Sequence, residues 1–366
     1  MNTVTRPAPV PPAKLAQFVE RARHYLFRVH QRTVPPYAAM MEMLMNAWAA
    51  QAITAAAQLG IADALAGGPL GADELATSVN ADADALQRLL RVLIGRGIFR
   101  QRRDGRYQLN PLADTLRCNA PKSVAGLASL YGSREHREHW SYLSEAIRTG
   151  KAVIPVLHGA DAFDYLSSEP ELAKVFNRAM AETTEMTVPF LLAAYPFDAY
   201  PTVVDVGGGV GRLLAAILAD TPTARGVLYD LPHAVAEAPA LLRQHGVADR
   251  VRVDEGSFFD GVPTGGDIYV LKMIIHDWPE DQAIEILRNV RAAAQVGTTL
   301  LLIETVIPDR NREHVGNWTN LEMLLMNAGR ERTAAEYRRL LQQAGFQVTR
   351  VVPTGSPFSL VEAKAI

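Results

Sequence analysis

A short stretch at residues 202–216, TVVDVGGGVGRLLAA, constrains the fold more than any other part of the chain. Its first half is rich in valine, which is typical of a strand buried on both faces. Four glycines follow within five residues, and apolar residues then recur at helical spacing. The stretch therefore predicts a strand, a glycine turn and a helix. In such a turn the backbone can approach a ligand closely, and the helix start offers free N–H groups.

The spacing of the glycines narrows the kind of ligand. A dinucleotide fingerprint needs G-x-G-x-x-G, but Arg212 occupies the position of its third glycine, and no P-loop lysine follows. Gly207, Gly209 and Gly211 instead form G-x-G-x-G, two residues after Asp205. This acidic flank favours a ligand that carries positive charge, such as a sulfonium with an amino group. The alternative is a tight strand-to-helix connection that binds nothing.

From residue 200 onward, strands and helices alternate in the pattern of a parallel, doubly wound α/β sheet. Strands are expected at 202–206, 226–230, 250–254, 267–272, 299–304 and about 346–352, with a last antiparallel strand at 356–363. Ligands of such sheets bind beyond the carboxyl ends of the strands. Asp230 ends the second strand, where a carboxylate can accept both hydroxyls of a ribose.

The sharpest catalytic candidate is His276, which follows the strand at 267–272. A histidine in this position can act as a general base near neutral pH. Glu304, at the end of the next strand, is expected to orient the imidazole and to stabilise its protonated form. Glu331, in the segment GRERT, is a second acid that can reach the ring. The histidines and acids lack a metal-ligand spacing such as H-E-x-x-H, so no metal is predicted.

The first half of the chain predicts a different kind of domain. Residues 15–118 are expected to be helical, with helix, helix and hairpin in the order of a winged helix. Methionines and a tryptophan at 40–48 predict core or a subunit interface. Residues 119–195 predict a helical connector that lines the substrate pocket. The proline-rich segment 1–14 predicts a disordered arm, and 196–366 form the ligand-binding sheet domain.

Charge and cysteine content bear on partners and compartment. The formal net charge is −2, which gives no bulk attraction to nucleic acid. The single cysteine, Cys118, allows no intramolecular disulfide and is typical of a reducing compartment. The N-terminus lacks the apolar segment of a signal peptide, and no run of about 18 apolar residues predicts a membrane span. A cytoplasmic protein is therefore expected.

One surface of the winged helix supports a rival interpretation, because a cluster of arginines there could contact phosphate. The cluster comprises Arg88, Arg91, Arg96, Arg100, Arg102, Arg103 and Arg106. On this alternative the protein is a DNA-binding ligand sensor. A solvated face on a dimerisation domain explains the same arginines, and the near-zero net charge favours that explanation.

Six segments in the order DVGGGVG, LYDLP, GSFF, LKMIIHDW, ETVIP and GRERT resemble a known family. It is the family of class I S-adenosylmethionine-dependent small-molecule O-methyltransferases of the caffeic acid and acetylserotonin type, with bacterial natural-product relatives. The resemblance covers nearly the whole chain after about residue 35. It implies a winged-helix dimerisation domain followed by a Rossmann-like methyltransferase domain. It also implies a homodimer that forms through the N-terminal domain, and a role in secondary metabolism.

The resemblance also implies roles for individual residues. The glycine turn would lie under the methionine part of the cofactor, and Asp230 would take the ribose hydroxyls. Phe258 would border the adenine, Lys272 would lie close to the cofactor, and His276 would be the base. The family often has an acid where this chain has Ser257. Expected cofactor residues are Asp205, Gly207, Gly209, Gly211, Asp230, Leu231, Ser257, Phe258 and Lys272; expected catalytic residues are His276, Glu304 and Glu331; expected substrate residues are Met180, Met323 and Asn327.

The sequence therefore predicts methyl transfer from S-adenosylmethionine, with S-adenosylhomocysteine as product, to a hydroxyl of a small aromatic acceptor. A close alternative is a relative that decarboxylates or hydroxylates polyketides without methylating them. The presence of His276 and Glu304 disfavours it, because those reactions do not need the pair. The sequence leaves open which acceptor is used and whether oxygen or nitrogen is methylated.

Overall fold

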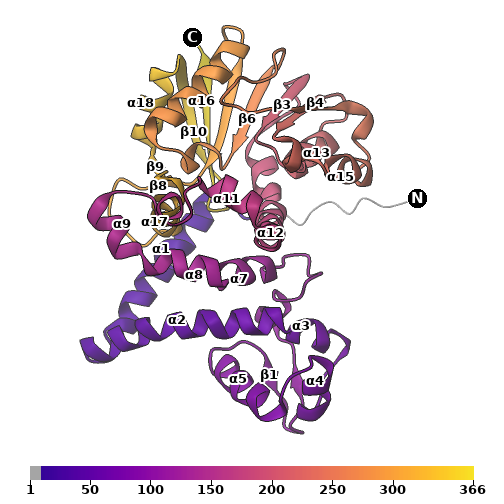
Figure 1. Cartoon of the computed structure of the whole chain (residues 1–366), viewed down its shortest axis with the longest axis vertical. Coiled ribbons are helices and arrows are strands. Elements are labelled where there is room, and N and C mark those ends of the chain that lie inside the picture. Colours follow the sequence, from indigo (N-terminus) through magenta and orange to yellow (C-terminus); the bar gives the residue numbers. More distant parts are fainter. Residues whose placement is uncertain (1–9) are drawn as a thin grey trace. The chain divides into compact units, whose positions relative to one another are not determined.

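The computed structural model describes residues 10–366 (Figure 1). The chain forms two units that alternate along the sequence. One unit contains the described residues up to His24, Leu143–Ala162 and Thr187–Ile366; the other contains Tyr25–Tyr142 and Phe163–Met186. Most of the predicted arm at 1–14 lies outside the described residues, and helix α1 (Ala13–Gln31) includes its last two positions. The predicted domain boundaries remain predictions.

The first unit is built on a seven-stranded sheet of order β10-β11-β7-β6-β3-β4-β5. Its strands are β3 (Thr202–Val206), β4 (Arg225–Asp230), β5 (Val251–Glu255), β6 (Ile268–Lys272), β7 (Thr299–Glu304), β10 (Phe346–Pro353) and β11 (Ser359–Ala365). Strands β3 to β7 pair in parallel, and β11 pairs antiparallel with both β7 and β10. The predicted strands, including the last antiparallel one, are confirmed. The order places the carboxyl ends of β7, β6 and β3 next to one another.

Helices cover the sheet, which explains why its central strands are apolar throughout. All residues of β7 are buried, and so are four of the five in β3 and in β6. Helices α13 (Arg212–Asp220) and α15 (Ala238–Gln244) share one core cluster with alternate residues of the strands. Helices α16 (Glu280–Ala293) and α18 (Ala334–Gln343) contact each other, and α18 packs on β10. The chain is thus wound on both sides of the sheet.

Short elements complete this unit around the carboxyl ends of the strands. They are α9 (Leu143–Thr149), α10 (Val153–His158), α14 (Pro232–Val235), η3 (Ile275–Asp277), β8 (Val306–Ile307), α17 (Val315–Asn327) and β9 (Arg332–Thr333). The short turn η2 (Ala248–Arg250) precedes β5 at its amino end. Helix α17 packs on α10 and η3, and β8 pairs in parallel with β9. The β8–β9 pair holds the segment before β9 close to the end of β7.

The second unit has the predicted helix, helix and hairpin. Its elements are α2 (Pro36–Gln58), α3 (Ile61–Ala64), η1 (Leu65–Gly67), α4 (Ala72–Ser78), α5 (Ala83–Gly95), β1 (Arg100–Gln101), β2 (Tyr107–Gln108), α6 (Pro111–Asp114), α7 (Ala125–Tyr131) and α8 (Arg134–Ser141). Helices α11 (Ala162–Ser168) and α12 (Pro170–Ala194), like α1, have residues in both units. Strands β1 and β2 pair antiparallel, and their core includes residues of α4 and α5. The winged-helix arrangement is confirmed.

Helix α2 carries the methionine-rich segment, and its apolar side chains are exposed in the single chain. Met40, Met41 and Leu44 are all more than half exposed, and Trp48 is 74% exposed. These residues therefore do not form core within one chain. A contiguous apolar face of this kind is typical of a protein–protein interface, the second of the two predicted roles.

Candidate functional site

The glycine turn after β3 is shaped for close approach of a ligand. Gly207, Gly209 and Gly211 all have positive φ, at 69°, 56° and 82°. A Cβ at Gly207 would lie 2.5 Å from Cδ1 of Ile274, so a larger residue cannot replace it without displacing that side chain. A Cβ at Gly209 would meet no atom of the described chain within 4 Å. The middle of the turn therefore faces open space, with the start of α13 directly behind it.

Two acids flank this turn. The oxygens of Asp230 accept hydrogen bonds from the backbone N–H groups of Gly209 and Leu231, both at 2.7 Å. Asp205 is buried, and its Oδ2 has no hydrogen-bond partner among the described residues. Burial, followed by the charge of Asp230, raises the pKa of Asp205 to about 7 against the opposing effect of Lys272. The two acids suit a ligand that carries positive charge, and the Oδ2 atom of Asp205 is available to accept a hydrogen bond from it.

The loop after β5 is held by side chains on both sides. The Tyr229 hydroxyl donates to the carbonyls of Ser257 and Gly261 at 3.0 and 2.8 Å. Asn289 donates to the carbonyls of Phe258 and Phe259 at 2.9 and 2.8 Å. The Ser257 hydroxyl accepts from the backbone N–H of residue 259 at 3.2 Å, so it is turned toward its own loop. Sequence reasoning missed Tyr229 and Asn289, which fix the loop through its carbonyl groups.

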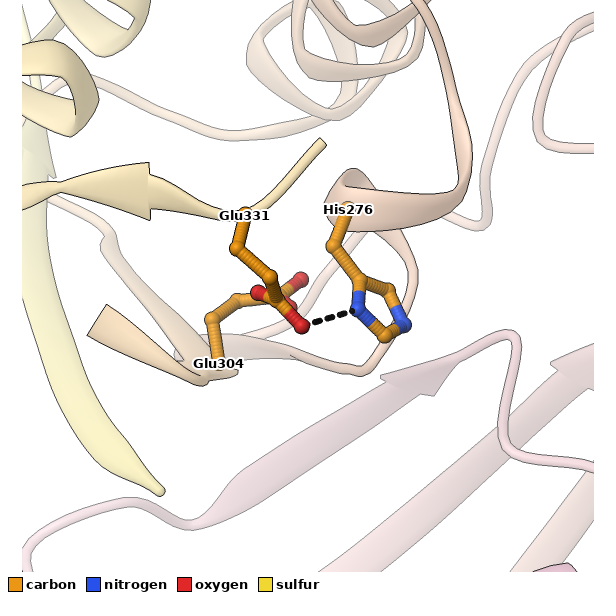
Figure 2. Close-up of side chains that lie close together, drawn as sticks. All are labelled: His276, Glu304 and Glu331. Atoms are coloured by element: carbon orange, nitrogen blue, oxygen red, sulfur yellow. Dashed lines mark hydrogen bonds and ion pairs between the residues drawn. The ribbon is translucent and has the colours of Figure 1, made fainter. Parts of the chain in front are cut away.

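His276 lies on η3, beyond the end of β6, and is 4% exposed. Its Nδ1 lies 3.0 Å from Oε1 of Glu331 (Figure 2). Glu304 accepts instead from the backbone N–H groups of Ile274 and Ile275, at 3.2 and 2.9 Å. Glu304 was expected to orient the imidazole and Glu331 to reach the ring. Glu331 holds the ring, whereas Glu304 holds the backbone of the turn that carries the ring.

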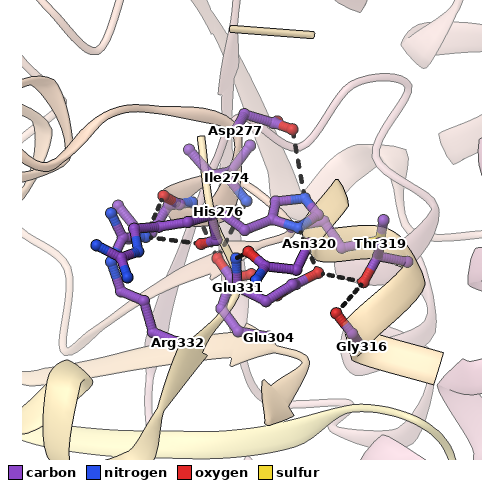
Figure 3. Close-up of polar contacts among 12 residues, drawn as sticks. Ile274, His276, Asp277, Glu304, Gly316, Thr319, Asn320, Glu331 and Arg332 are labelled. Carbon is purple, nitrogen blue, oxygen red and sulfur yellow. Dashed lines mark hydrogen bonds and ion pairs between the residues drawn. The ribbon is translucent and has the colours of Figure 1, made fainter. Parts of the chain in front are cut away.

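Helix α17 fixes Glu331 in turn (Figure 3). The Thr319 hydroxyl donates to Glu331 Oε1 at 2.8 Å, and this is the same oxygen that faces His276. The backbone N–H of Glu331 donates to Asn320 Oδ1 at 2.9 Å. Partners of this kind fix the orientation of a functional carboxylate. Neither residue was identified from the sequence, because no local pattern connects α17 to the GRERT segment.

The turn that carries His276 is held through its backbone. Arg332 is fully buried, and its guanidinium donates to the carbonyls of Ile275, Arg330 and Trp278 at 2.9, 3.1 and 3.3 Å. The N–H of Arg330 donates to the carbonyl of His276 at 2.8 Å. These bonds attach the segment before β9 directly to η3, so a shift of one segment moves the other.

Gly329 allows this close attachment. A Cβ at this position would lie 2.2 Å from the carbonyl oxygen of His276 and 2.5 Å from the carbonyl carbon of Asp277. Both are backbone atoms and cannot rotate away. We expect Gly329→Ala to displace η3 and to lower kcat at least tenfold, since a misplaced catalytic group is costly. Gly95→Ala, at the exposed last residue of α5 where φ is not positive and a Cβ would meet nothing within 4 Å, serves as the control. Equal kcat values in the two variants would contradict this explanation.

Three acids surround the imidazole of His276, and their charges raise its pKa, whereas burial lowers it. Burial alone would lower the pKa of His276, but Asp277, Glu304 and Glu331 together raise it to about 10. Nε2, the nitrogen not bonded to Glu331, lies 3.4 Å from Asp277 Oδ1. One ring nitrogen of His276 and one carboxylate oxygen each of Glu304 and Glu331 lie within 4.8 Å of one another, close enough to hold a metal ion together. No metal was predicted from the sequence.

Two of the three expected substrate residues lie on α17. Met323 and Asn327 are both buried. Asn327 Oδ1 accepts from the N–H of Ala162 at 2.8 Å, and its Nδ2 has no partner among the described residues. Met180 is half-buried on α12 and belongs to the second unit. The amide of Asn327 thus offers a buried donor close to the turn that carries His276.

Comparison with known proteins assigns the chain to a family. Residues 140–347 match the O-methyltransferase domain, and residues 41–117 match the O-methyltransferase dimerisation domain. The phenazine O-methyltransferase PhzM of Lysobacter antibioticus is 38% identical over 91% of this chain and 97% of its own length. The chain belongs to the O-methyltransferase family.

Solved structures of other O-methyltransferases agree with this assignment. The crystal structure of LaPhzM has a TM-score of 0.87 at 38% identity, covering 91% of this chain and 100% of that one. NcsB1 from neocarzinostatin biosynthesis, solved with S-adenosylmethionine and 2-hydroxy-5-methyl naphthoic acid, has a TM-score of 0.75 at 34% identity, covering 87% and 96%. The resemblance and the fold class inferred from the sequence are confirmed. The protein is an S-adenosylmethionine-dependent O-methyltransferase.

The arginine cluster of this O-methyltransferase is partly paired within its own unit. Arg88 forms an ion pair with Asp84, and Arg102 with Asp104. The guanidinium of Arg96 donates to Asn46 Oδ1 at 3.1 Å. Such pairing suits a solvated surface, the explanation that was preferred over contact with DNA. Across residues 10–366, no helix has the length and apolar character needed to cross a bilayer.

Proposed function

We propose that this O-methyltransferase methylates a hydroxyl on a small aromatic natural product, with His276 as the general base. The observation that carries the proposal is the place of the His276–Glu331 pair, which lies beyond β6, next to the glycine turn that follows β3. The relatives support the acceptor class, since PhzM is named for phenazine and NcsB1 was solved with a hydroxylated naphthoic acid.

The side chains around His276 orient it to remove a proton once the imidazole, whose pKa is raised to about 10, has lost its own. With a hydrogen on Nδ1 donated to Glu331, the lone pair of neutral imidazole lies on Nε2, which can accept the proton of an acceptor hydroxyl. Bound S-adenosylmethionine supplies a methyl group made electrophilic by the sulfonium. The protein has to orient the acceptor oxygen toward that carbon and to take its proton at Nε2. Met323 and Asn327, both on α17, are proposed to border the acceptor.

The cofactor residues are proposed from their positions around the glycine turn and the neighbouring strand ends. The glycine turn accommodates the methionine part, and Asp205 and Lys272 lie behind it. Leu231, Ser257 and Phe258 are proposed to border the ribose and adenine. The dimerisation domain and the exposed apolar face of α2 support a homodimer formed through this helix.

Asp230 provides a direct test of the cofactor site. We expect Asp230→Asn to raise the dissociation constant for S-adenosylhomocysteine at least tenfold, because an amide replaces one of the two acceptor oxygens and removes the charge. Asp254→Asn on β5, whose carboxylate pairs with Arg252 at 2.8 Å, is the matched control. Calorimetric titration measures both variants. Equal affinities would exclude Asp230 from the ribose site.

The acceptor is tested with a labelled methyl group. Purified protein is incubated with labelled S-adenosylmethionine and a panel of hydroxylated phenazines, naphthoates and benzoates, each paired with its amino analogue. Label in a hydroxylated member, with a mass gain of one CH₂, supports the proposal. Label only in amino analogues would make the enzyme an N-methyltransferase. Loss of CO₂ or gain of oxygen would support the non-methylating alternative.

A further inference from the structure

Three aromatic rings join two segments of the site. The first segment is the cofactor loop, residues 256–261 after β5, and the second is the base turn, residues 273–278 between β6 and α16. The ring centroids of Phe259 and Trp278 lie 4.8 Å apart, those of Phe258 and Trp278 6.1 Å apart, and those of Phe258 and Phe259 5.1 Å apart. Aromatic pairs attract one another at such separations. The indole of the base turn therefore packs with both phenyl rings of the cofactor loop.

The backbone of the base turn fixes this indole. Trp278 is 8% exposed, and its carbonyl accepts a hydrogen bond from the Arg332 guanidinium at 3.3 Å. Pro279, the N-cap residue of α16, follows directly and restricts the backbone there. His276 lies only two residues before Trp278. A displacement of the indole is therefore passed on to the segment that carries the imidazole.

Helix α16 connects the same two segments a second time. The helix begins directly after the base turn and Pro279. Further along it, Asn289 donates to the carbonyls of Phe258 and Phe259 at 2.9 and 2.8 Å. The cofactor loop is thus held at two points, by the indole before the helix and by an amide on the helix.

The rings also reach the glycine turn after β3. A Cβ at Gly207 would lie 3.7 Å from Cε1 of Phe258 and 2.5 Å from Cδ1 of Ile274. One residue of the cofactor loop and one residue of the base turn therefore border the glycine turn together. A cofactor that lies on the glycine turn and packs against Phe258 contacts a ring that already packs against Trp278.

We propose that Trp278 is a positioning residue through which the bound cofactor orders the base turn and so places His276. Packed side chains and rigid elements of this kind carry coupling between sites. A ligand that packs on the rings reduces the local opening of the segments attached to them. The proposal deepens the proposed function and rests on it, because Phe258 is assigned there to the cofactor and His276 to the base.

Hydrogen–deuterium exchange tests the coupling without any measurement of activity. The full-length protein is examined by mass spectrometry with and without saturating S-adenosylhomocysteine. In the wild-type protein, the cofactor product should slow exchange in the base turn about tenfold, a typical coupling between sites. In Trp278→Leu it should slow the base turn by less than about threefold, because the ring contacts that carry the coupling are lost. Protection of the cofactor loop should remain, and Trp278→Phe, which keeps an aromatic ring, should restore most of the effect.

Two further variants make the test specific. Phe259→Leu removes the other ring of the pair from a half-buried position, so it should reproduce the result of Trp278→Leu even if the indole is needed for folding. Phe18→Leu on α1 removes a ring that is 67% exposed, and it should leave the effect at its wild-type value. Each variant is compared with itself with and without S-adenosylhomocysteine, so a general loss of stability cancels from the ratio.

Two results would overturn the proposal. One is a wild-type base turn whose exchange does not respond to S-adenosylhomocysteine. The other is a response that survives in full in both Trp278→Leu and Phe259→Leu, which would mean that the cofactor orders the base turn without these rings. Failure of the proposed function has a different signature: exchange would respond as expected, while removal of the His276 side chain left methyl transfer intact.

Discussion

His276→Ala should lower kcat for methyl transfer by about 10²–10⁴-fold, the usual contribution of a general base. The dissociation constants for S-adenosylmethionine and S-adenosylhomocysteine should change by less than about threefold, because nothing in the proposed mechanism requires the imidazole for cofactor binding. Single-turnover rates with a labelled methyl group and calorimetric titration measure the two quantities separately.

The control for this variant is His245→Ala, since His245 is an exposed histidine at the end of α15. It should match the wild-type protein in both measurements. A parallel loss of turnover and of cofactor affinity in His276→Ala would show that the side chain supports the fold of the site. His276→Gln, which keeps much of the side-chain volume, would then separate packing from proton removal.

Arg332→Met should lower the free energy of unfolding by about 3 kcal/mol or more, because hydrogen bonds from a charged donor are worth about 1.5–3 kcal/mol each and three carbonyls, two of them buried, lose their partner. Methionine has a similar length and keeps the site filled. Urea unfolding followed by circular dichroism measures the change. Turnover should fall as well, since η3 and the residue that follows it lose two of their attachments.

Arg330→Met provides the comparison. The guanidinium of Arg330 is half exposed and lies 3.6 Å from Glu336, a surface ion pair of the kind worth about 0–1 kcal/mol. Its side chain therefore contributes little, although its backbone N–H holds His276. If both substitutions changed stability equally, the carbonyl contacts of Arg332 would not be the source of its effect.

The sheet and the glycine turn could be predicted because their signals are local. Valine-rich strands, glycines at a fixed spacing and the repeat of strand and helix all lie within short windows. Ligands of such sheets bind beyond the carboxyl ends of the strands, and this rule placed Asp230, His276 and Glu304 at one edge of the sheet before any contact was known. Glu331, which lies 55 residues after His276, was named instead from the segment GRERT.

These local signals could not predict which acid holds the imidazole ring and which holds the backbone of the turn. It depends on the β8–β9 pair and on α17, which set the distance from Glu331 to the ring through Thr319 and Asn320. Gly329 was also missed, because a glycine after a helix is usually explained as a helix end. Only the approach of the His276 backbone in space shows why a side chain is excluded there.

The attachments of η3 also bear on how acceptor range can evolve in such an enzyme. Glu304 contacts the N–H groups of residues 274 and 275, and Arg332 contacts the carbonyls of 275 and 278. These contacts use atoms that every residue except proline possesses. A substitution on this turn therefore leaves these contacts in place, while the buried side chain of Ile275 has to remain apolar. Lineages can thus change their acceptors by mutation around the base without rebuilding the base itself.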